Sequence, residues 1–155
     1  MIAEFGHFLI ALALAASLAQ TGFGLAGPRR IKAAGPAATA AAEVTVLASL
    51  GAMALLIAAL VRSDFSIAYV AGHSHVDKPL FYNVAAAWGG HEGSMLLWCL
   101  LLALFGWGLA RAAGGGDAVR ARAAGLQGAL QSAFFAFLVF ASNPFQRVFP
   151  APFEG

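Results

Sequence analysis

The stretch WGGHEGSMLLWCLLLALFGWGLA, residues 88–110, places a histidine and a glutamate among glycines, directly before one of the most apolar runs in the chain. The run from Ser94 to Ala110 has no charged side chain, and it approaches the ~20 apolar residues that a membrane-spanning helix needs. Because a bilayer strongly disfavours buried ionisable groups, His91 and Glu92 either stay at the water boundary or are retained for a function. This pair marks both the start of a predicted span and a candidate site.

The composition of the whole chain indicates a membrane protein. Hydrophobic residues make up 61% of its 155 residues and charged residues only 10%, which is too little polar surface for a water-soluble domain of this length. We therefore predict an all-α polytopic membrane protein with about four transmembrane helices, near residues 5–25, 37–61, 94–110 and 124–141. Residues 1–155 are expected to form one module, with a loop at 62–93 and a tail at 142–155.

Basic residues in the loops predict the orientation of the helices, because lysine and arginine near helix ends are retained on the cytoplasmic side. Six of the nine basic residues follow the first or the third predicted helix: Arg29, Arg30, Lys32, Arg111, Arg120 and Arg122. In a four-helix topology these two loops share one side. Both termini and the 62–93 loop are therefore expected outside the cytoplasm, in bacteria the periplasm. Nucleic-acid binding is not expected, because no basic stripe is interleaved with aromatic residues.

The 62–93 loop and the tail are rich in aromatic residues. The loop contains Phe65, Tyr69, Phe81 and Tyr82 as well as Trp88, and aromatic residues at this density are typical of an interfacial belt on the membrane. In the tail, prolines prevent a continuing helix, and three phenylalanines are candidate apolar anchors: Phe145, Phe149 and Phe153. We expect much of the loop and the tail to lie along the bilayer surface.

Two motif matches lack the context that their chemistry needs. The stretch GFGLAG, residues 22–27, fits the dinucleotide fingerprint, but that fingerprint functions after a strand and at the start of a helix. Here it ends a predicted membrane helix, so a helix-terminating glycine cluster is the better interpretation. His91 and Glu92 begin a zinc-protease pattern in which Met95 replaces the second histidine ligand. No nucleophile with its base is recognised, and no catalytic residue is assigned.

A metal site is not predicted either. His73, His75 and Asp77 in the stretch AGHSHVD could surround a metal ion if the loop were extended. Structural zinc needs four defined ligands, so a solvated loop is the preferred interpretation. Cys99 is the only cysteine, which excludes an intramolecular disulfide and any CxxC motif. Its expected role is packing.

Two interpretations of residues 88–94 remain open. If the helix begins near Gly93 or Ser94, Ser94 can cap its free amide groups while Glu92 lies at the positive end of the helix dipole. Alternatively, the glycines permit the close approach of another backbone or of a flat ligand. A direct ligand or partner contact would then be formed by Trp88, Gly89, Gly90, His91, Glu92, Gly93 and Ser94.

Four ordered motifs carry a family resemblance that covers essentially the whole chain. They are IAEFGHFLIALALA at residues 2–15, DFSIAYVAGHS at 64–74, WGGHEGSMLLW at 88–98 and FASNPFQRVFPAPFEG at 140–155. In this order and spacing they resemble the opening part of the cytochrome c maturation protein F (CcmF) family, which belongs to the haem-handling membrane proteins. The relative placement of the predicted helices agrees with this resemblance.

The resemblance implies a subunit of the bacterial or organellar cytochrome c haem lyase, located in the inner membrane. Such a subunit takes haem from a periplasmic chaperone and attaches it through thioether bonds to the CxxCH cysteines of apocytochrome c. The family signature is a tryptophan-rich periplasmic segment with flanking histidines that hold haem, and this chain stops before that segment. The haem ligands are therefore expected outside this chain, and the resemblance does not assign them to His7, His73, His75 or His91.

The expected function is that of an N-terminal module in haem delivery to apocytochrome c, with haem as the implied cofactor. Expected partners are the remainder of the haem lyase subunit, other cytochrome c maturation subunits, the haem chaperone, apocytochrome c and membrane lipid. A fragment, a truncated gene product and one piece of a split protein remain open. Two alternative functions also remain: a ligand-free membrane scaffold, and part of an ion or solute transporter. The transporter is disfavoured because His91 and Glu92 precede a span rather than lie at its centre.

Overall fold

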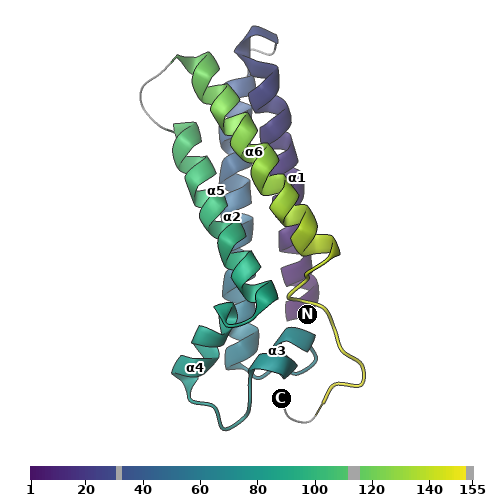
Figure 1. Ribbon diagram of the computed structural model, residues 1–155. Helices are drawn as coiled ribbons and strands as arrows, with labels where there is room; N and C mark the ends of the chain where they lie inside the picture. Colours follow the sequence, from purple (N-terminus) through teal and green to yellow (C-terminus); the bar gives the residue numbers. More distant parts are fainter. Residues whose placement is uncertain (31–32, 112–115, 153–155) are drawn as a thin grey trace.

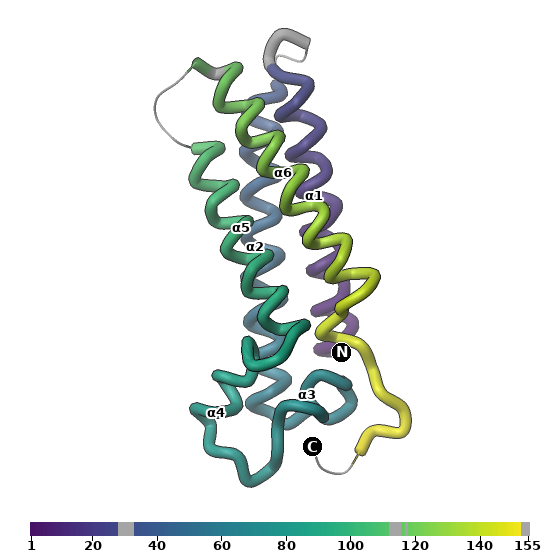
Figure 2. The backbone as a smooth tube through the Cα atoms, in the orientation of Figure 1, coloured from purple at the N-terminus to yellow at the C-terminus, as the bar shows by residue number. Residues whose placement is uncertain are grey.

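Four long helices run along the molecule, and a group of short elements closes one end (Figures 1 and 2). The computed structural model describes residues 1–30, 33–111 and 116–152. The long helices are α1 (Ile2–Arg30), α2 (Ala34–Val61), α5 (His91–Arg111) and α6 (Asp117–Phe140). The short elements between α2 and α5 are α3 (Ala68–His73), α4 (Leu80–Ala85) and the 3-10 turn η1 (Ala86–Trp88).

Each long helix contains a stretch that is long and apolar enough to cross a membrane. These stretches are Ile2–Gly27, Ala34–Val61, His91–Arg111 and Ala118–Phe140. The 21 residues of α5 cover about 31 Å at 1.5 Å per residue, close to the thickness of the hydrocarbon core. The described residues contain no β-strand, only one isolated bridge. The prediction of an all-α polytopic membrane protein with four transmembrane helices is confirmed.

The helices extend beyond the apolar runs that predicted them. α2 begins at Ala34 rather than at residue 37. Pro36 does not prevent this earlier start, because it lies in the first turn, where backbone N–H groups have no helical acceptor. α6 begins at Asp117 rather than at residue 124. Hydropathy marks the part of a helix that is apolar, whereas the helix itself continues as long as its backbone hydrogen bonds do.

α1 and α6 pack so closely that their contact requires glycine. A Cβ atom on Gly24 would overlap the backbone of Gly125, and a Cβ atom on Gly125 would overlap the backbone at Gly24 and Leu25. Farther along the contact, Gly128 lies against Thr21 in the same way. No hydrophobic effect draws helices together in lipid, so close backbone packing of this kind supplies much of the attraction.

Hydrogen bonds between buried polar side chains reinforce the same contact. Gln131 Nε2 donates to Gln20 Oε1 at 2.8 Å, and Gln20 Nε2 donates to the Ala124 carbonyl oxygen at 2.9 Å. The hydroxyl of Ser132 also donates to the hydroxyl of Ser17 at 2.8 Å. A shift of one helix along the other would leave these groups unpaired in an apolar interior. The polar residues of α1 therefore set its position along α6.

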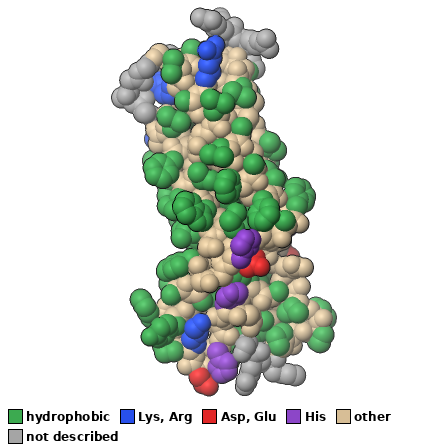
Figure 3. Space-filling view, viewed as in Figure 1, with side chains coloured by type: hydrophobic (Ala, Val, Ile, Leu, Met, Phe, Trp, Pro, Cys, Tyr) green, Lys and Arg blue, Asp and Glu red, His purple; other side chains and the backbone are tan. Residues whose placement is uncertain are grey.

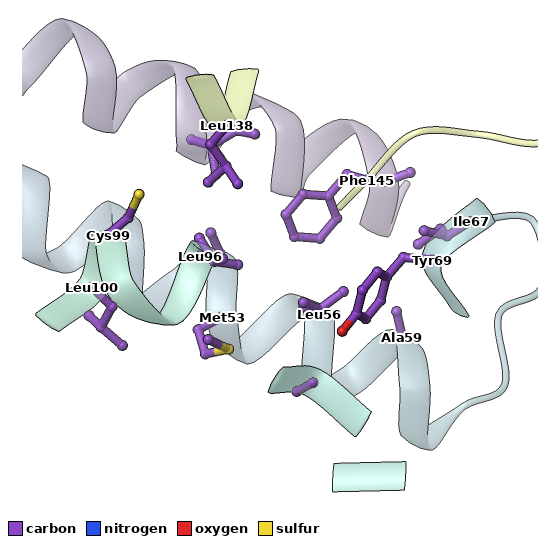
Figure 4. Packing of buried hydrophobic residues seen from close by; sticks show 14 of the residues in the cluster. Met53, Leu56, Ala59, Ile67, Tyr69, Leu96, Cys99, Leu100, Leu138 and Phe145 are labelled. Carbon is purple, nitrogen blue, oxygen red and sulfur yellow. The ribbon is translucent and has the colours of Figure 1, made fainter. Parts of the chain in front are cut away.

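The main hydrophobic core lies in the half of the bundle next to the short elements (Figure 4). Its fully buried side chains include Leu56, Leu60, Ile67, Leu96, Phe135 and Leu138. Tyr69 and Phe145 belong to this core at 5% and 3% exposure, so the expectation that both lie along the bilayer is wrong. The ring of Phe145 packs against Gly6 of α1. Phe149 is exposed, and Phe153 lies outside the described residues.

The tail after α6 turns back beside α3 at the closed end of the bundle (Figure 1). Ile67 and Arg147 form an antiparallel bridge, and the Ala68 N–H group donates to the Gln146 carbonyl oxygen at 2.8 Å. The Arg147 guanidinium also donates to the Glu4 carboxylate at the start of α1, with Nε 2.6 Å from Oε1. The tail thus joins the first helix to the segment that follows α2.

We expect Gly24→Ala to lower the free energy of unfolding by about 1–3 kcal/mol, because overpacking a close contact forces the two backbones apart. Gly22→Ala is the matched control in the same helix, since nothing lies within 4 Å of the added Cβ atom. Thermal unfolding of the purified chain in detergent, followed by circular dichroism, measures both variants. Equal stability of the two would show that Gly24 is not required for the contact.

Candidate functional site

The start of α5 differs from the sequence-based expectation. The helix begins at His91, so Glu92 lies in its first turn, where a carboxylate interacts favourably with the helix dipole. Ser94 lies inside the helix, and its hydroxyl donates to the His91 carbonyl oxygen at 3.0 Å. The expected N-cap at Ser94 is therefore wrong, because the helix starts three residues earlier and the hydroxyl acts as a donor, not as an acceptor for amide groups.

His91 is exposed and contacts the end of α6 and the tail. Its Nδ1 atom lies 3.0 Å from Ser142 Oγ, and its ring meets Phe137 edge-on at a centroid distance of 6.1 Å. His7 of α1 makes a similar contact with the tail, with Nδ1 2.8 Å from Asn143 Nδ2. Histidine side chains follow one another over the lower part of the face in Figure 3. These contacts fasten the start of α5 while the imidazole of His91 stays accessible.

Tyr69 of α3 lies directly behind this stretch and holds it in place. Its hydroxyl donates to the Ala86 carbonyl oxygen at 2.8 Å and accepts the Gly90 N–H group at 3.0 Å. Its ring stacks on His73 with centroids 4.3 Å apart and planes 18° apart. Burial raises the pKa of the Tyr69 phenol above its ordinary value of 10.0, so the hydroxyl remains a donor near neutral pH.

The glycines around His91 allow the Tyr69 and His73 rings to approach the backbone. A Cβ atom on Gly90 would overlap the His73 imidazole, and a Cβ atom on Gly93 would overlap the Ala87 carbonyl oxygen and the Tyr69 hydroxyl. Gly89 differs, because its Cβ would make only ordinary contacts, at 3.5 Å or more. Two of the three glycines in this stretch are therefore required by packing inside the chain.

The short elements α3, α4 and η1, together with the tail after α6, form a cap on this end of the bundle. The other polar residues of the cap contact neighbours that are close in the sequence. His73 Nδ1 lies 2.9 Å from the Tyr69 carbonyl oxygen, and because a carbonyl only accepts, Nδ1 carries the proton. Lys78 Nζ donates to the His73 carbonyl oxygen at 2.7 Å, while His75 Nδ1 is 4.0 Å from the Asp77 carboxylate. Among the described residues, no group of three or more His, Cys, Asp or Glu side chains is placed to hold a metal ion.

The aromatic residues predicted for an interfacial belt have different environments. Phe81 and Tyr82 of α4 are 77% and 59% exposed, and their rings form an edge-to-face pair with centroids 5.9 Å apart. Trp88 is also exposed, whereas Phe65 is partly buried against the main core. An interfacial position for Phe81 and Tyr82 stays a prediction.

Three contacts that shape this site have no signal in the sequence. Phe137 and Ser142 contact His91, and His73 packs against Gly90. Ser142 lies 51 residues after His91, and no local pattern connects the two. Only the return of α6 to the start of α5 brings them together. Tyr69 was recognised as an aromatic residue, but its hydrogen bonds to the backbone on either side of η1 could not be inferred from spacing.

The chain is thus a helical membrane protein in which the short elements and the tail form a cap. An exposed histidine, His91, begins the span α5. No family model matches the chain. It is 45% identical over its whole length to the cytochrome c-type biogenesis protein ccl1 of Rhodobacter capsulatus, 42% identical to CycK of Bradyrhizobium diazoefficiens and 38% identical to CcmF of Escherichia coli. The chain spans 24% of the length of each of these curated relatives.

A solved structure of the cytochrome c heme lyase CcmF superposes with a TM-score of 0.87 at 32% sequence identity. The match covers 94% of this chain and 25% of that structure. The chain therefore belongs to the CcmF family of cytochrome c-type biogenesis proteins. This confirms the family resemblance that the four ordered motifs predict.

We expect Gly93→Ala to lower the free energy of unfolding by about 2–3 kcal/mol, because the methyl group displaces Tyr69 and its hydrogen bonds. Gly89→Ala is the matched control, since its Cβ has room, and it should change stability by less than about 0.5 kcal/mol. Urea unfolding in detergent micelles compares the two. A neutral Gly93→Ala variant would mean that Tyr69 does not hold this backbone.

Proposed function

We propose that this chain acts in c-type cytochrome biogenesis, as the N-terminal membrane module of a haem lyase subunit that helps deliver and attach haem to apocytochrome c. The observation that carries the proposal is the similarity along the whole chain to relatives named for cytochrome c-type biogenesis. The solved heme lyase shares the fold. The chain spans about a quarter of the length of these proteins. We therefore assign the formation of the thioether bonds between haem and apocytochrome c to the complete subunit.

The residues from Trp88 to Ser94 are proposed as the part of this module that meets haem or apocytochrome c. The His91 imidazole is exposed, and the neighbouring Phe137 ring is 44% exposed. An imidazole beside an aromatic ring suits the edge of a flat, largely apolar cargo such as haem. The axial ligands of the haem iron are proposed to come from the remainder of the subunit, while His91 contacts the edge of the haem ring.

The proposed partners follow from the same role. They are the remainder of the haem lyase subunit, other cytochrome c maturation subunits, a haem chaperone, apocytochrome c and membrane lipid. The proposed location is the inner membrane of a bacterium or an organelle. We further propose that both termini and the cap face the periplasm, since six of the nine basic residues follow the first or the third predicted span in the sequence.

Single-cysteine labelling tests this orientation, because Cys99 is fully buried and should stay silent. The Asp77 side chain is 94% exposed in the cap, so Asp77→Cys should react with a membrane-impermeant maleimide in intact spheroplasts. Val119, at the start of α6, is 67% exposed, and Val119→Cys should react only after the membrane is opened. The reverse labelling pattern would invert the proposed topology.

A ligand-free scaffold is the second candidate, and the contacts of the site favour it. His91 is joined to Ser142, and Gly90 and Gly93 are filled by Tyr69 and His73. In a scaffold, holding the cap against the helices would be the only role of these contacts. A transporter has less support, because His91 and Glu92 occupy the first turn of a span, not its middle.

The two candidates differ in the effect of His91→Ala. In cells that also express the remainder of the subunit, we expect this variant to lower the yield of haem-stained cytochrome c about tenfold, the effect of one lost contact of about 1.4 kcal/mol. The thermal stability of the purified assembly should fall by less than about 1 kcal/mol, because the side chain is exposed. His7→Ala is the matched control, since His7 is also exposed and also bonded to the tail.

The Soret absorbance of the purified chain and of the assembly completes the test. Haem should be retained only by the assembly, with His91→Ala reducing delivery to apocytochrome more than haem content. A scaffold is indicated instead if His91→Ala and His7→Ala behave alike. A Soret band in the isolated chain that His91→Ala removes would make His91 a ligand of the haem iron. It would contradict the proposal that His91 contacts only the edge of the haem ring.

A further inference from the structure

The imidazole of His91 has one ring nitrogen turned toward the chain and the other turned away from it. Within the described residues, the ring forms one hydrogen bond, in which Nδ1 lies 3.0 Å from Ser142 Oγ. The ring also meets Phe137 edge-on, at a centroid distance of 6.1 Å. Nδ1 and Nε2 lie on opposite sides of an imidazole, so Nε2 points away from Ser142. Because His91 is exposed, Nε2 is the nitrogen that a ligand can reach.

Ser142 decides which nitrogen of His91 carries the proton. Ser142 is buried, at 5% exposure, and within the described residues its hydroxyl has one hydrogen-bond partner, His91 Nδ1. A serine hydroxyl has a hydrogen to donate, and a buried donor without an acceptor costs free energy. The hydroxyl therefore donates to Nδ1, which must be the unprotonated nitrogen. In neutral His91 the proton is then on Nε2, and the accessible group is an N–H donor.

An accessible N–H group differs in chemistry from a metal ligand. A neutral imidazole binds iron through the lone pair of its unprotonated nitrogen, and in His91 that lone pair accepts the hydrogen bond from Ser142. The Nε2–H group instead needs an acceptor, and hydrogen bonds to an ionised carboxylate are among the stronger ones. Haem carries propionate carboxylates at one edge of its ring. The geometry therefore favours a contact with that edge over a bond to the iron.

The acidic neighbour of His91 lies on another side of the helix. Successive residues of an α-helix project about 100° apart, and Glu92 lies toward Tyr69. Burial is the main cause of the raised pKa of the Tyr69 phenol, and the charge of Glu92 contributes to it. The aromatic neighbour of His91 is Phe137, which is 44% exposed. An apolar ring beside an N–H donor suits a flat apolar molecule with a carboxylate at its edge.

We propose that the Nε2–H group of His91 donates a hydrogen bond to a haem propionate, and that Ser142 is the positioning residue that keeps the proton on Nε2. This rests on the proposed role of the chain in haem delivery, and it names the part of haem that the site recognises. Ser142 acts through the imidazole of His91 and does not touch haem itself.

The first test determines the tautomer of His91. The full chain is labelled with nitrogen-15 in its histidine rings and studied by NMR in detergent micelles. The pH is about 8, above the ordinary histidine pKa of about 6.5. We expect the His91 ring to have an unprotonated Nδ1 and a protonated Nε2. An unprotonated Nε2 in the native chain would overturn the role of Ser142.

Substitutions at Ser142 show whether its hydroxyl sets this tautomer. Ser142→Ala should convert the single tautomer into a mixture, because Nδ1 loses its donor, and Ser142→Thr should restore it, because the hydroxyl is kept. Ser132→Ala is the matched control, since Ser132 is a buried serine of α6 whose hydroxyl contacts Ser17 instead of His91. Equal effects of Ser132→Ala and Ser142→Ala would mean that altered packing, and not the hydroxyl, moves the proton.

The second test measures recognition of the carboxylates in the absence of iron. Metal-free protoporphyrin and its dimethyl ester are titrated onto the assembly of this chain with the remainder of the subunit, and fluorescence anisotropy gives both dissociation constants. We expect the diacid to bind about tenfold more tightly than the diester, as one charge-assisted hydrogen bond predicts. All variants are compared in the same micelles, so that partitioning of the porphyrins into detergent cancels.

Two substitutions of His91 place the donor at different distances from the backbone. The amide N–H group of His91→Gln reaches about as far as Nε2, so this variant should keep most of the difference between diacid and diester. The amide of His91→Asn reaches only about as far as Nδ1, so this variant should lose the difference. Neither amide binds haem iron as an imidazole does, so retention by His91→Gln cannot come from ligation.

The outcomes separate this proposal from the proposed function. If the assembly binds neither porphyrin and retains no haem, the role in haem handling is itself wrong. If the native assembly binds both porphyrins equally, or if His91→Asn keeps the native difference, the propionate contact is overturned while the role in haem handling remains. Loss of the difference in both His91→Gln and His91→Asn would assign the contact to packing of the imidazole ring and overturn the role of the Nε2–H group.

Discussion

The contact between α1 and α6 is the constraint on which the rest of the structure depends. Gly24 and Gly125 let the two backbones meet, and the amides of Gln20 and Gln131 hold the helices at one position along their length. A bilayer supplies no hydrophobic drive for this association, so shape and buried hydrogen bonds must supply it. With α1 and α6 locked together, the tail leaves α6 close to the start of α1.

Tyr69 connects this helical frame to the candidate site. Its hydroxyl joins the backbone before and after η1, and its ring occupies the space that Gly90 and Gly93 leave open. The His91 side chain is fixed from the other side by Ser142. The site is therefore held by contacts from α3 and from the tail, which also pair with each other through Ile67 and Arg147. A side chain that contacts a ligand needs rigid support of this kind.

The two ends of the bundle are packed with side chains of different size. The cap end is filled by large side chains such as Leu56 and Phe135, while the opposite end is lined by alanines around an open cleft. A well-packed end can hold His91 in a defined place. The chain therefore combines a closely packed cap end with an opposite end that its small side chains leave open.

The sequence by itself determined the fold class, the four spans and the family, because hydropathy depends on composition and because ordered motifs such as residues 88–98 are specific. It also identified His91 and Glu92 as the pair at the start of a span. Only the tertiary structure decided that Tyr69 is buried, that Ser94 is no cap and that His91 meets Ser142. The physical reason is that burial and hydrogen bonding depend on segments far apart in the chain, which residue type and local spacing do not specify.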